Sequence, residues 1–541
     1  MTRPSILLGP DEHRVSDELQ LVLAGIPGIY QRGRQLIQVV HSPAPADLSA
    51  VRRVENTPTM ALLARSNLRT LMTRHCCFLK PKIRNGEVVL NEGGQPLLVE
   101  AHPPEWAVSS LYEQSSWPVP VLYATVEAPV ILSDGRILTT PGYDLGSGLY
   151  YHPGPGLNAL PLPLSNSPGP DQVELAKAYL HEVVCDMPFE KACHRSGWYA
   201  GVLSYLARWA YKGPTPLFLI SKNAPGIGGS RLAEAAQLIC AGRKGTLYTV
   251  AVDNQQEKKQ LDQVALNGDL VVYIDNINES TPFGTGELDK ALTQDVWDCS
   301  VKYKDGTYRV PLLAIWWATG NNVQYRRGVD TFRRTQLIRL VSSLERPQER
   351  KDLQHPDLLG WVLENRGQLL WSFLTLLRAY FAAGKPKHGL KTWGGFESWS
   401  DIVRECLVFH GYDDPYLASE QLTQLSDPAQ MACRRLLLGW EELCAAAGQP
   451  DGLSAHEAIG YLETELEERR AVPSKVKEHE LLIAALNELA PRKGSARLPD
   501  APALGYLFRK YHLRVFDGRR LESDDRSTSR GRVWVVRKAA P

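Results

Sequence analysis

A glycine-rich loop within residues 221–236, SKNAPGIGGSRLAEAA, is the segment of this chain whose residue types most clearly predict chemistry. The apolar run PLFLI before it predicts a buried strand, and the residues from Arg231 to Arg243 predict a helix. A strand, a glycine-rich turn and a helix start together aim backbone N–H groups at phosphate. We therefore predict a phosphate-binding loop that includes Pro225, Gly226, Gly228, Gly229, Ser230 and Arg231.

This loop matches the Walker A pattern G-x-x-x-x-G-K-[ST] only in part. Gly228 and Ser230 fit, and the Ser230 hydroxyl is expected to bind Mg²⁺. The first glycine is replaced by asparagine, and the lysine by Gly229. That lysine neutralises charge on the β- and γ-phosphates of a nucleotide, so its loss removes a close cation. Lys222 and Arg231 flank the loop and are the candidates to replace it.

Polar side chains follow two further apolar strands. The segment GDLVVYIDNINES (268–280) predicts a strand that delivers Asp275 at its end, and VPLLAIWWATGNN (310–322) ends in two asparagines. In open parallel sheets, ligands bind outside the carboxyl ends of the strands. We predict that Asp275 binds the metal ion and that Asn321 positions an attacking water. A helix-capping role is the alternative for Asp275.

Two adjacent arginines precede the next apolar strand. The segment RRGVDTFRRTQLIRLV (326–341) contains Arg333 and Arg334 immediately before this strand. A guanidinium group there is suited to stabilise transferring phosphate on the nucleotide of a neighbouring subunit. A solvated charge cluster is the alternative interpretation.

Composition describes a globular chain of several domains. Of its 541 residues, 43% are hydrophobic and 22% charged, with a net charge of +1. Any nucleic-acid binding must therefore come from local patches. The sequence has no apolar run long enough to span a bilayer and no signal-peptide pattern, so we expect a cytoplasmic protein without membrane contact.

The order of elements predicts an α/β protein. Strands alternate with helices between 170 and 345, which predicts a parallel sheet with covering helices. We expect an N-terminal α+β domain at 1–165, a helical region at 346–450 and a C-terminal domain at 451–541. Prolines concentrated in 153–170 predict a linker before the sheet.

The C-terminal tail is the most basic part of the chain. Residues 509–538 hold ten Lys or Arg against four Asp or Glu, and a predicted helix at 501–512 precedes short strands. This order predicts a winged-helix-like domain that contacts DNA phosphates, with a partner-docking module as the alternative. The expected contact residues are Arg519, Arg520, Arg530 and Arg532.

The central region resembles the ATPase core of AAA+ and superfamily 3 helicases. More closely, SDGRILTTPGYD, LISKNAPGIGGSRLAE, VVYIDN, WWATGNN and DTFRR are similar to stretches found in that order in primase-associated helicases of phages, prophages and plasmids. The resemblance covers most of 1–420. It implies a hexameric ring that uses ATP and Mg²⁺ to move on single-stranded DNA, with a primase or other replication protein as a possible partner.

The same resemblance implies roles for individual residues. Asp275 would be the Walker B residue, Asn321 or Asn322 the sensor, and Arg333 or Arg334 the arginine finger. Asn276 stands where many ATPases have a catalytic glutamate, a replacement that such relatives tolerate, and Glu279 is the other candidate for that role.

The resemblance also implies a DNA-contacting hairpin before the sensor strand. CSVKYKDGTYRV (299–310) fits this place, because Asp305-Gly306 is a strong hairpin signal between two extended arms. Lys302 and Lys304 would then bind DNA phosphate as point charges, without reading sequence.

Three functions remain open from the sequence. The first is a replicative helicase motor driven by ATP. The second is a catalytically impaired relative that binds nucleotide and serves as a scaffold or origin-binding subunit, because Gly229 replaces the loop lysine. The third, weaker one is a DNA-sensing defence ATPase.

Overall fold

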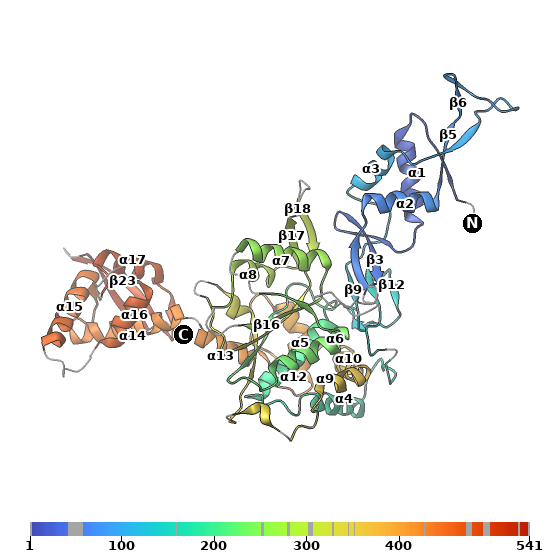
Figure 1. The fold of residues 1–541 in the computed structure, drawn as a ribbon. Coiled ribbons are helices and arrows are strands. Elements are labelled where there is room, and N and C mark those ends of the chain that lie inside the picture. The colour runs from blue at the N-terminus through green and yellow to red at the C-terminus, as the bar shows by residue number, and fades with distance from the viewer. Residues whose placement is uncertain are drawn as a thin grey trace. The chain divides into compact units, whose positions relative to one another are not determined.

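The computed structural model describes the chain as two compact units, Met1–Leu422 and Thr423–Pro541 (Figure 1). The described residues are 3–41, 58–157, 160–249, 254–277, 282–300, 307–326, 329–344, 346–350, 352–426, 428–471, 479–490, 498–528 and 531–538.

The first unit is built around a parallel sheet of five strands. Its order is β15-β16-β19-β14-β20, so the strand before the glycine-rich loop has β19 and β20 as its two neighbours. The expected parallel α/β sheet is confirmed. The strands are β14 (Leu217–Lys222), β15 (Thr246–Leu247), β16 (Val271–Ile277), β19 (Ile315–Asn321) and β20 (Thr335–Leu340).

Both faces of this sheet are buried, as near-continuous apolar runs require. Phe218 and Ile220 belong to the core cluster that includes α5, α6 and α10. Leu217 and Leu219, one residue out of phase, belong to the cluster that includes α7 and α8. The covering helices are α5 (Ala192–Leu206), α6 (Gly229–Ala241), α7 (Asn254–Asn267), α8 (Gly286–Ala291) and α10 (Arg366–Ala382).

Further elements of the first unit surround this core. They include α4 (Pro170–Glu182), β17 (Val296–Ser300), β18 (Thr307–Pro311), α9 (Leu358–Glu364), α11 (Glu397–Trp399), α12 (Glu405–Phe409) and most of α13 (Tyr416–Ser426). Short 3-10 turns span Thr331–Arg334 and Pro347–Glu349, and a π-helical turn spans Ser400–Arg404. β17 and β18 pair antiparallel, as a hairpin requires.

The N-terminal region combines small sheets with helices. The sequence IYQRGRQLIQVV (29–40), two extended runs around Gly33, predicts a hairpin, and the antiparallel pair β2 (Ile29–Arg32) and β3 (Gln35–His41) confirms it. The sequence of residues 57–75 predicts a single helix. This prediction is wrong in its first part, because β4 (Pro58–Leu62) pairs with β3 and only α2 (Arg65–His75) is helical. Alternate side chains of β4 are buried, Met60 among them, and this period of two favours a strand.

The remaining N-terminal elements are short. The helices are α1 (Glu12–Ala24) and α3 (Glu105–Glu113). The strands are β1 (Ser5–Leu7), β5 (Cys77–Pro81), β6 (Ile83–Arg84), β7 (Glu87–Val88), β8 (Leu98–Ala101), β9 (Ala124–Val126), β10 (Val130–Ile131), β11 (Ile137–Leu138), β12 (Gly142–Asp144) and β13 (Leu149–Tyr151).

The proline-rich stretch predicted as a linker packs against the core. Arg366, fully buried at the start of α10, donates to the carbonyl oxygen of Pro155 at 2.8 Å and to that of Glu127 at 2.9 Å. Its other donors reach the carbonyl oxygens of Ile239 at 3.1 Å and Cys240 at 3.2 Å, in the last turn of α6. One buried guanidinium therefore ties this stretch to the helix that follows the glycine-rich loop.

The C-terminal unit is formed by helices and an antiparallel sheet in the order β21-β24-β23-β22. Trp534 of β24 is buried in the core of this unit, and its carbonyl oxygen accepts a hydrogen bond from the Trp440 indole. The winged-helix assignment stays a prediction. The elements are α14 (Pro428–Ala446), β21 (Leu453–Ser454), α15 (Ala455–Ala471), α16 (Glu480–Leu489), α17 (Ala501–Tyr511), β22 (Val515–Phe516), β23 (Arg519–Thr528) and β24 (Gly531–Lys538).

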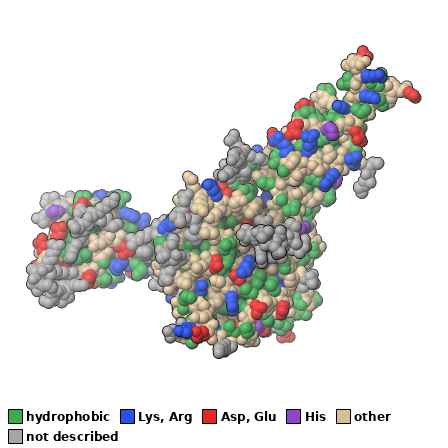
Figure 2. Space-filling model, viewed as in Figure 1, with side chains coloured by type: hydrophobic (Ala, Val, Ile, Leu, Met, Phe, Trp, Pro, Cys, Tyr) green, Lys and Arg blue, Asp and Glu red, His purple; other side chains and the backbone are tan. Residues whose placement is uncertain are grey.

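The domain limits expected at 165, 345 and 450 remain predictions. The division at 422 groups helix α14 with the C-terminal unit. No helix among the described residues has the length and apolar character to cross a bilayer. On the face seen in Figure 2, basic and acidic side chains are interspersed over the described parts, which is consistent with a net charge of +1.

The motif SDGRILTTPGYD has a structural role in the first unit. Arg136 donates two hydrogen bonds to the Asp144 carboxylate, at 3.1 and 3.0 Å, and the Ser147 hydroxyl donates a third at 2.6 Å. The hydrogen bonds from Arg136, and then those from Ser147, lower the pKa of Asp144 from 3.8 to about 2. This carboxylate joins β12 to the turn before β11.

We predict that Asp144→Asn lowers the Tm of the protein and changes its pH dependence. A carboxylate whose pKa is depressed by folding contributes stability above its unfolded pKa and loses it as the pH falls toward about 2. The Tm difference between wild type and variant should therefore be constant from pH 7 to about pH 4 and shrink below that. Thermal melts across this range measure it, and a pH-independent difference would contradict the assignment.

Candidate functional site

The glycine-rich loop lies between the end of β14 and the start of α6. Gly226 has φ +81° and Gly228 has φ +104°, a left-handed conformation that glycine adopts without strain. Gly228 caps α6 and has no side chain to accept a hydrogen bond from the first turn of this helix. The loop therefore presents the N–H groups of a helix N-terminus without a side-chain cap, which is suited to an anion.

Two later residues brace the loop. The Asn223 side-chain amide donates to the carbonyl oxygen of Ser342 at 3.0 Å and accepts from the Ser342 N–H at 3.1 Å. Gln348 lies against Gly226, where a Cβ atom would approach its Oε1 to 2.9 Å. The asparagine in place of the first Walker A glycine thus fastens the loop to the segment after β20.

Asp275 lies where β16 breaks its pairing with β19. The register shifts between Ile274 and Ile277, and Asn276 in this bulge has φ +51°. Bulges re-aim side chains, and the Asp275 side chain is exposed at the carboxyl edge of the sheet. The Thr319 hydroxyl of β19 donates to Asp275 Oδ1 at 2.9 Å and accepts from the Asn276 N–H at 3.0 Å.

Tyr273 connects Asp275 to the loop. Its hydroxyl donates to Asp275 Oδ1 at 2.7 Å, and the Ser230 side chain lies close to this hydroxyl. Burial raises the pKa of the Tyr273 phenol, and the neighbouring Asp275 carboxylate raises it further. Ser230 and Asp275, the two predicted metal ligands, are therefore brought to the same place through one tyrosine.

The oxygen atoms at this edge fit a magnesium ion. Mg²⁺ prefers oxygen ligands and is commonly bound by one or two carboxylates together with substrate phosphates and water. Ser230 and Asp275 supply a hydroxyl and an exposed carboxylate. A cavity of about 790 Å³ also reaches Tyr273 and Asp275 from the β15 side of the sheet, so the carboxylate is open to a ligand. Within the described part of the chain, no cluster of three or more metal-binding side chains occurs.

Asn321 ends β19 directly beside the end of β14, where it pairs in register with Lys222. Its side-chain Oδ1 is buried and has no hydrogen-bond partner among the described residues. An unsatisfied buried oxygen is costly unless a ligand or water completes it. Asn322, the other sensor candidate, is exposed with φ +41°, and its N–H donates to the Lys222 carbonyl oxygen at 3.3 Å. Asn321 is the better placed of the two.

The predicted finger arginines lie at the opposite edge of the sheet. They precede Thr335, which pairs with Leu217 at the start of β14, whereas the loop follows Lys222 at its end. This offset of five strand residues is roughly 17 Å. The structure therefore does not bring Arg333 or Arg334 together with Asp275 and Asn321 in one chain.

The two arginines differ in their surroundings. Arg334 is mostly buried and forms an ion pair with Asp289 of α8 at 3.4 Å. The Arg333 side chain is 49% exposed, and its ion pair with Asp330 is long, at 3.9 Å. The Arg333 side chain is thus accessible to another molecule, whereas the Arg334 side chain connects the 3-10 turn at Thr331–Arg334 to α8 through Asp289.

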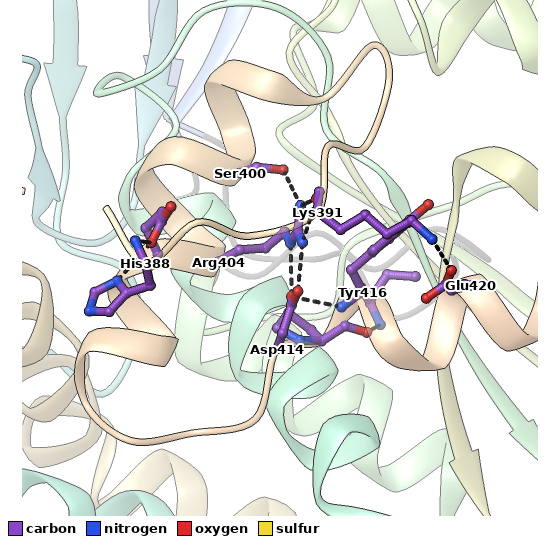
Figure 3. A network of polar contacts seen from close by, with 10 residues as sticks. His388, Lys391, Ser400, Arg404, Asp414, Tyr416 and Glu420 are labelled. Atoms are coloured by element: carbon purple, nitrogen blue, oxygen red, sulfur yellow. Dashed lines mark hydrogen bonds and ion pairs between the residues drawn. The ribbon is translucent and has the colours of Figure 1, made fainter. Parts of the chain in front are cut away.

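The backbone of Arg333 is held by a loop that a buried polar network fixes. The Trp393 indole donates to the Arg333 carbonyl oxygen at 2.9 Å. The loop that carries Trp393 is fixed by Arg404, which donates to the Lys391 carbonyl oxygen at 3.0 Å and binds both Asp414 oxygens, at 2.8 and 2.6 Å. Figure 3 shows Arg404 enclosed by these groups, with Tyr416 beside them.

We predict that Arg404→Met destabilises the first unit by about 3–5 kcal/mol, because it leaves the Asp414 carboxylate without its buried partner. Urea denaturation followed by tryptophan fluorescence measures the change. Arg346→Met is the matched control, since its pair with Glu349 is exposed on both sides, and we expect a change of about 0–1 kcal/mol. Equal effects of the two substitutions would contradict this account.

Several predicted residues lie elsewhere or outside the described part. Lys302, Lys304, Glu279 and Arg530 are outside the described residues. Arg519 pairs with Glu441 at 3.1 Å, and Arg520 pairs with Glu522. Arg532 is exposed on β24, and Arg231 is exposed on α6.

Sequence reasoning missed Tyr273 and Thr319. Tyr273 stands within an apolar strand and resembles a core aromatic, although its position two residues before Asp275 puts both on one face. Thr319 precedes the asparagines by two residues on the neighbouring strand, and only the sheet order shows that it reaches Asp275.

No protein-family model and no curated protein matches the chain. Among solved structures, the apo A form of the NrS-1 C-terminal region covers 82% of this chain and 92% of its own, with 11% identity and a TM-score of 0.38. The SCCmec type IV Cch active helicase covers 94% and 97%, with 11% identity and a TM-score of 0.32. The JCV helicase covers 52% and 72%, with 13% identity and a TM-score of 0.24. These similarities are low, so the case for function rests on the residues of the site.

Proposed function

We propose that the chain is an ATP- and Mg²⁺-dependent DNA helicase-like motor that assembles as a ring, a hexamer by resemblance, on single-stranded DNA. We further propose that it acts in replication of a phage, prophage or plasmid-type element. The observation that carries the proposal is the meeting of Ser230, Tyr273 and Asp275 at the carboxyl edge of the sheet, beside the unsatisfied oxygen of Asn321.

Each residue has a defined task in this proposal. The N–H groups of the loop from Gly226 to Ser230 would bind phosphate oxygens. Ser230 and Asp275 would hold Mg²⁺, which neutralises charge on the phosphates when bound. Asn321 would orient the attacking water through its unsatisfied Oδ1. Thr319 and Tyr273 keep the Asp275 carboxylate in place.

We predict that Asp275→Ala lowers the ATP hydrolysis rate by about 10²–10³-fold, the scale for one lost electrostatic group in such a site. Hydrolysis is measured with and without single-stranded DNA, and the DNA is expected to stimulate wild type. Asp401→Ala is the control, because this exposed carboxylate pairs with Lys387 at the surface and should leave the rate unchanged. Wild-type protein that binds no Mg²⁺–ATP in a fluorescent-analogue titration would refute the proposal.

The catalytically impaired scaffold is the second candidate, and Gly229 in the lysine position favours it. Such a subunit would bind nucleotide through the loop backbone without turning it over. The Gly229→Lys variant, made together with Lys222→Ala to clear the space beside position 229, separates the two functions. A motor hydrolyses ATP as wild type, whereas a scaffold gains hydrolysis only in the variant.

Arg333 would complete the site of an adjoining subunit. We predict that Arg333→Ala lowers hydrolysis by at least about 10³-fold, within the range for an arginine finger, without lowering the Tm. Mixing Arg333→Ala with the inactive Asp275→Ala protein should restore part of the activity, because some interfaces then combine an intact Asp275 with an intact Arg333. Arg334→Ala should lower the Tm instead, since it removes the ion pair to Asp289. Mixtures with no more activity than either variant alone would exclude an arginine acting between subunits.

DNA contact is proposed for the C-terminal unit through Arg532, whose exposed guanidinium is available for phosphate. Arg519 and Arg520 are held in ion pairs and contribute less net charge to such a surface. For Lys302, Lys304 and Arg530, the sequence prediction of phosphate contact stands.

A further inference from the structure

We propose that Lys222, at the end of β14, supplies the phosphate-binding cation that the glycine-rich loop lacks at position 229. The lysine has in effect moved from the helix start to the strand end, and Gly229 is glycine because the Lys222 stem occupies its side-chain space. This inference rests on the proposed nucleotide site and names the group that replaces its missing charge.

Packing between the two residues supports the exchange. A Cβ atom built on Gly229 would lie 2.6 Å from Lys222 Cδ and 3.0 Å from Lys222 Cγ. Real Cβ atoms essentially never approach so closely, so any side chain at 229 must displace the Lys222 stem. Gly229 is in the helix and has an ordinary φ, so its backbone does not demand glycine. Close packing therefore accounts for the glycine. The same Cβ atom would meet Lys222 and would also lie 3.2 Å from Ile220 Cγ2.

The Lys222 ammonium group is free of protein partners among the described residues, so it can bind an anion at the loop. The residue is only 8% exposed, yet no hydrogen bond or ion pair joins its ammonium group to any described residue. Burial lowers the pKa of Lys222, and the charge of Asp275 counteracts this in part. Losing part of its hydration is costly for a charged group, although the ammonium nitrogen itself is not fully buried and stays open to a ligand. A polyanion at the loop would offset that cost.

Position favours Lys222 over the other flanking cation. Lys222 pairs in register with Asn321 and interacts electrostatically with Asp275, so it belongs to the same edge of the sheet as both. Arg231 follows Ser230 on α6 and is exposed. A lysine acts on phosphate as a compact point charge on a flexible stem, which a strand end can deliver as well as a helix start.

Four proteins test the exchange by titration with a fluorescent ATP analogue and Mg²⁺: wild type, Lys222→Met, Arg231→Met and the double variant Lys222→Ala with Gly229→Lys. We expect Lys222→Met to bind roughly 10- to 100-fold more weakly, the scale for one charge-assisted contact. Arg231→Met tests the other flanking cation, and its loss of affinity should be smaller than that of Lys222→Met, because the Arg231 side chain is exposed. The double variant should recover much of the loss, because the charge returns to the helix start and the space beside it is cleared.

Thermal melts of the same proteins separate a lost ligand contact from a damaged fold. Methionine has a similar stem without the charge, so Lys222→Met should keep or raise the wild-type Tm. Weak binding accompanied by a lower Tm would count against the proposal. So would Lys222→Met that binds as tightly as wild type, or a double variant no better than Lys222→Met.

These outcomes are distinct from failure of the proposed function. If wild type binds the analogue with Mg²⁺ and Lys222→Met binds it equally well, the nucleotide site stands and only the assignment of its cation falls. If wild type binds no analogue, the nucleotide site itself is refuted and the assignment falls with it.

Discussion

In-register parallel pairing of β14 with β19 and β20 is the constraint on which the site depends. Because the three strands run in the same direction, their carboxyl ends meet at one edge, and Lys222 lies beside Asn321. A shift of one residue would turn every side chain to the other face of a sheet buried on both sides. The two core clusters that cover these faces therefore also fix the chemistry at the edge.

Around that edge, polar side chains position the Asp275 carboxylate and the glycine-rich loop. Tyr273 and Thr319 hold the Asp275 carboxylate from two strands, and Tyr273 extends the contact to Ser230 of the loop. The bulge at Asn276 exposes Asp275, while Ile274 and Ile277 on either side of the bulge stay paired with β19. The loop itself is fastened by Ser342, more than a hundred residues later in the chain. Residues that are far apart in the sequence thus position the side-chain oxygen atoms of Asp275 and Ser230.

Much of this architecture could be predicted from local pattern. Apolar runs of strand length, each followed by polar residues, indicated β14, β16 and β19 and the clustering of their ends. The pattern could not show which strands are neighbours, and so Thr319 was not connected with Asp275. It also misplaced the start of α2, because alternation over Pro58–Leu62 is weak beside the longer helical stretch. Close packing between Lys222 and Gly229 depends on three-dimensional proximity across a loop, which spacing alone does not reveal.

Helix α6 has unlike electrostatic partners at its two ends. The buried Arg366 guanidinium binds the carbonyl oxygens of Ile239 and Cys240 and so compensates the negative end of the helix dipole. The positive end, at Gly228, has no side-chain cap. Arg366 thus neutralises one end of the helix, while the other end keeps its attraction for a negative group at the loop.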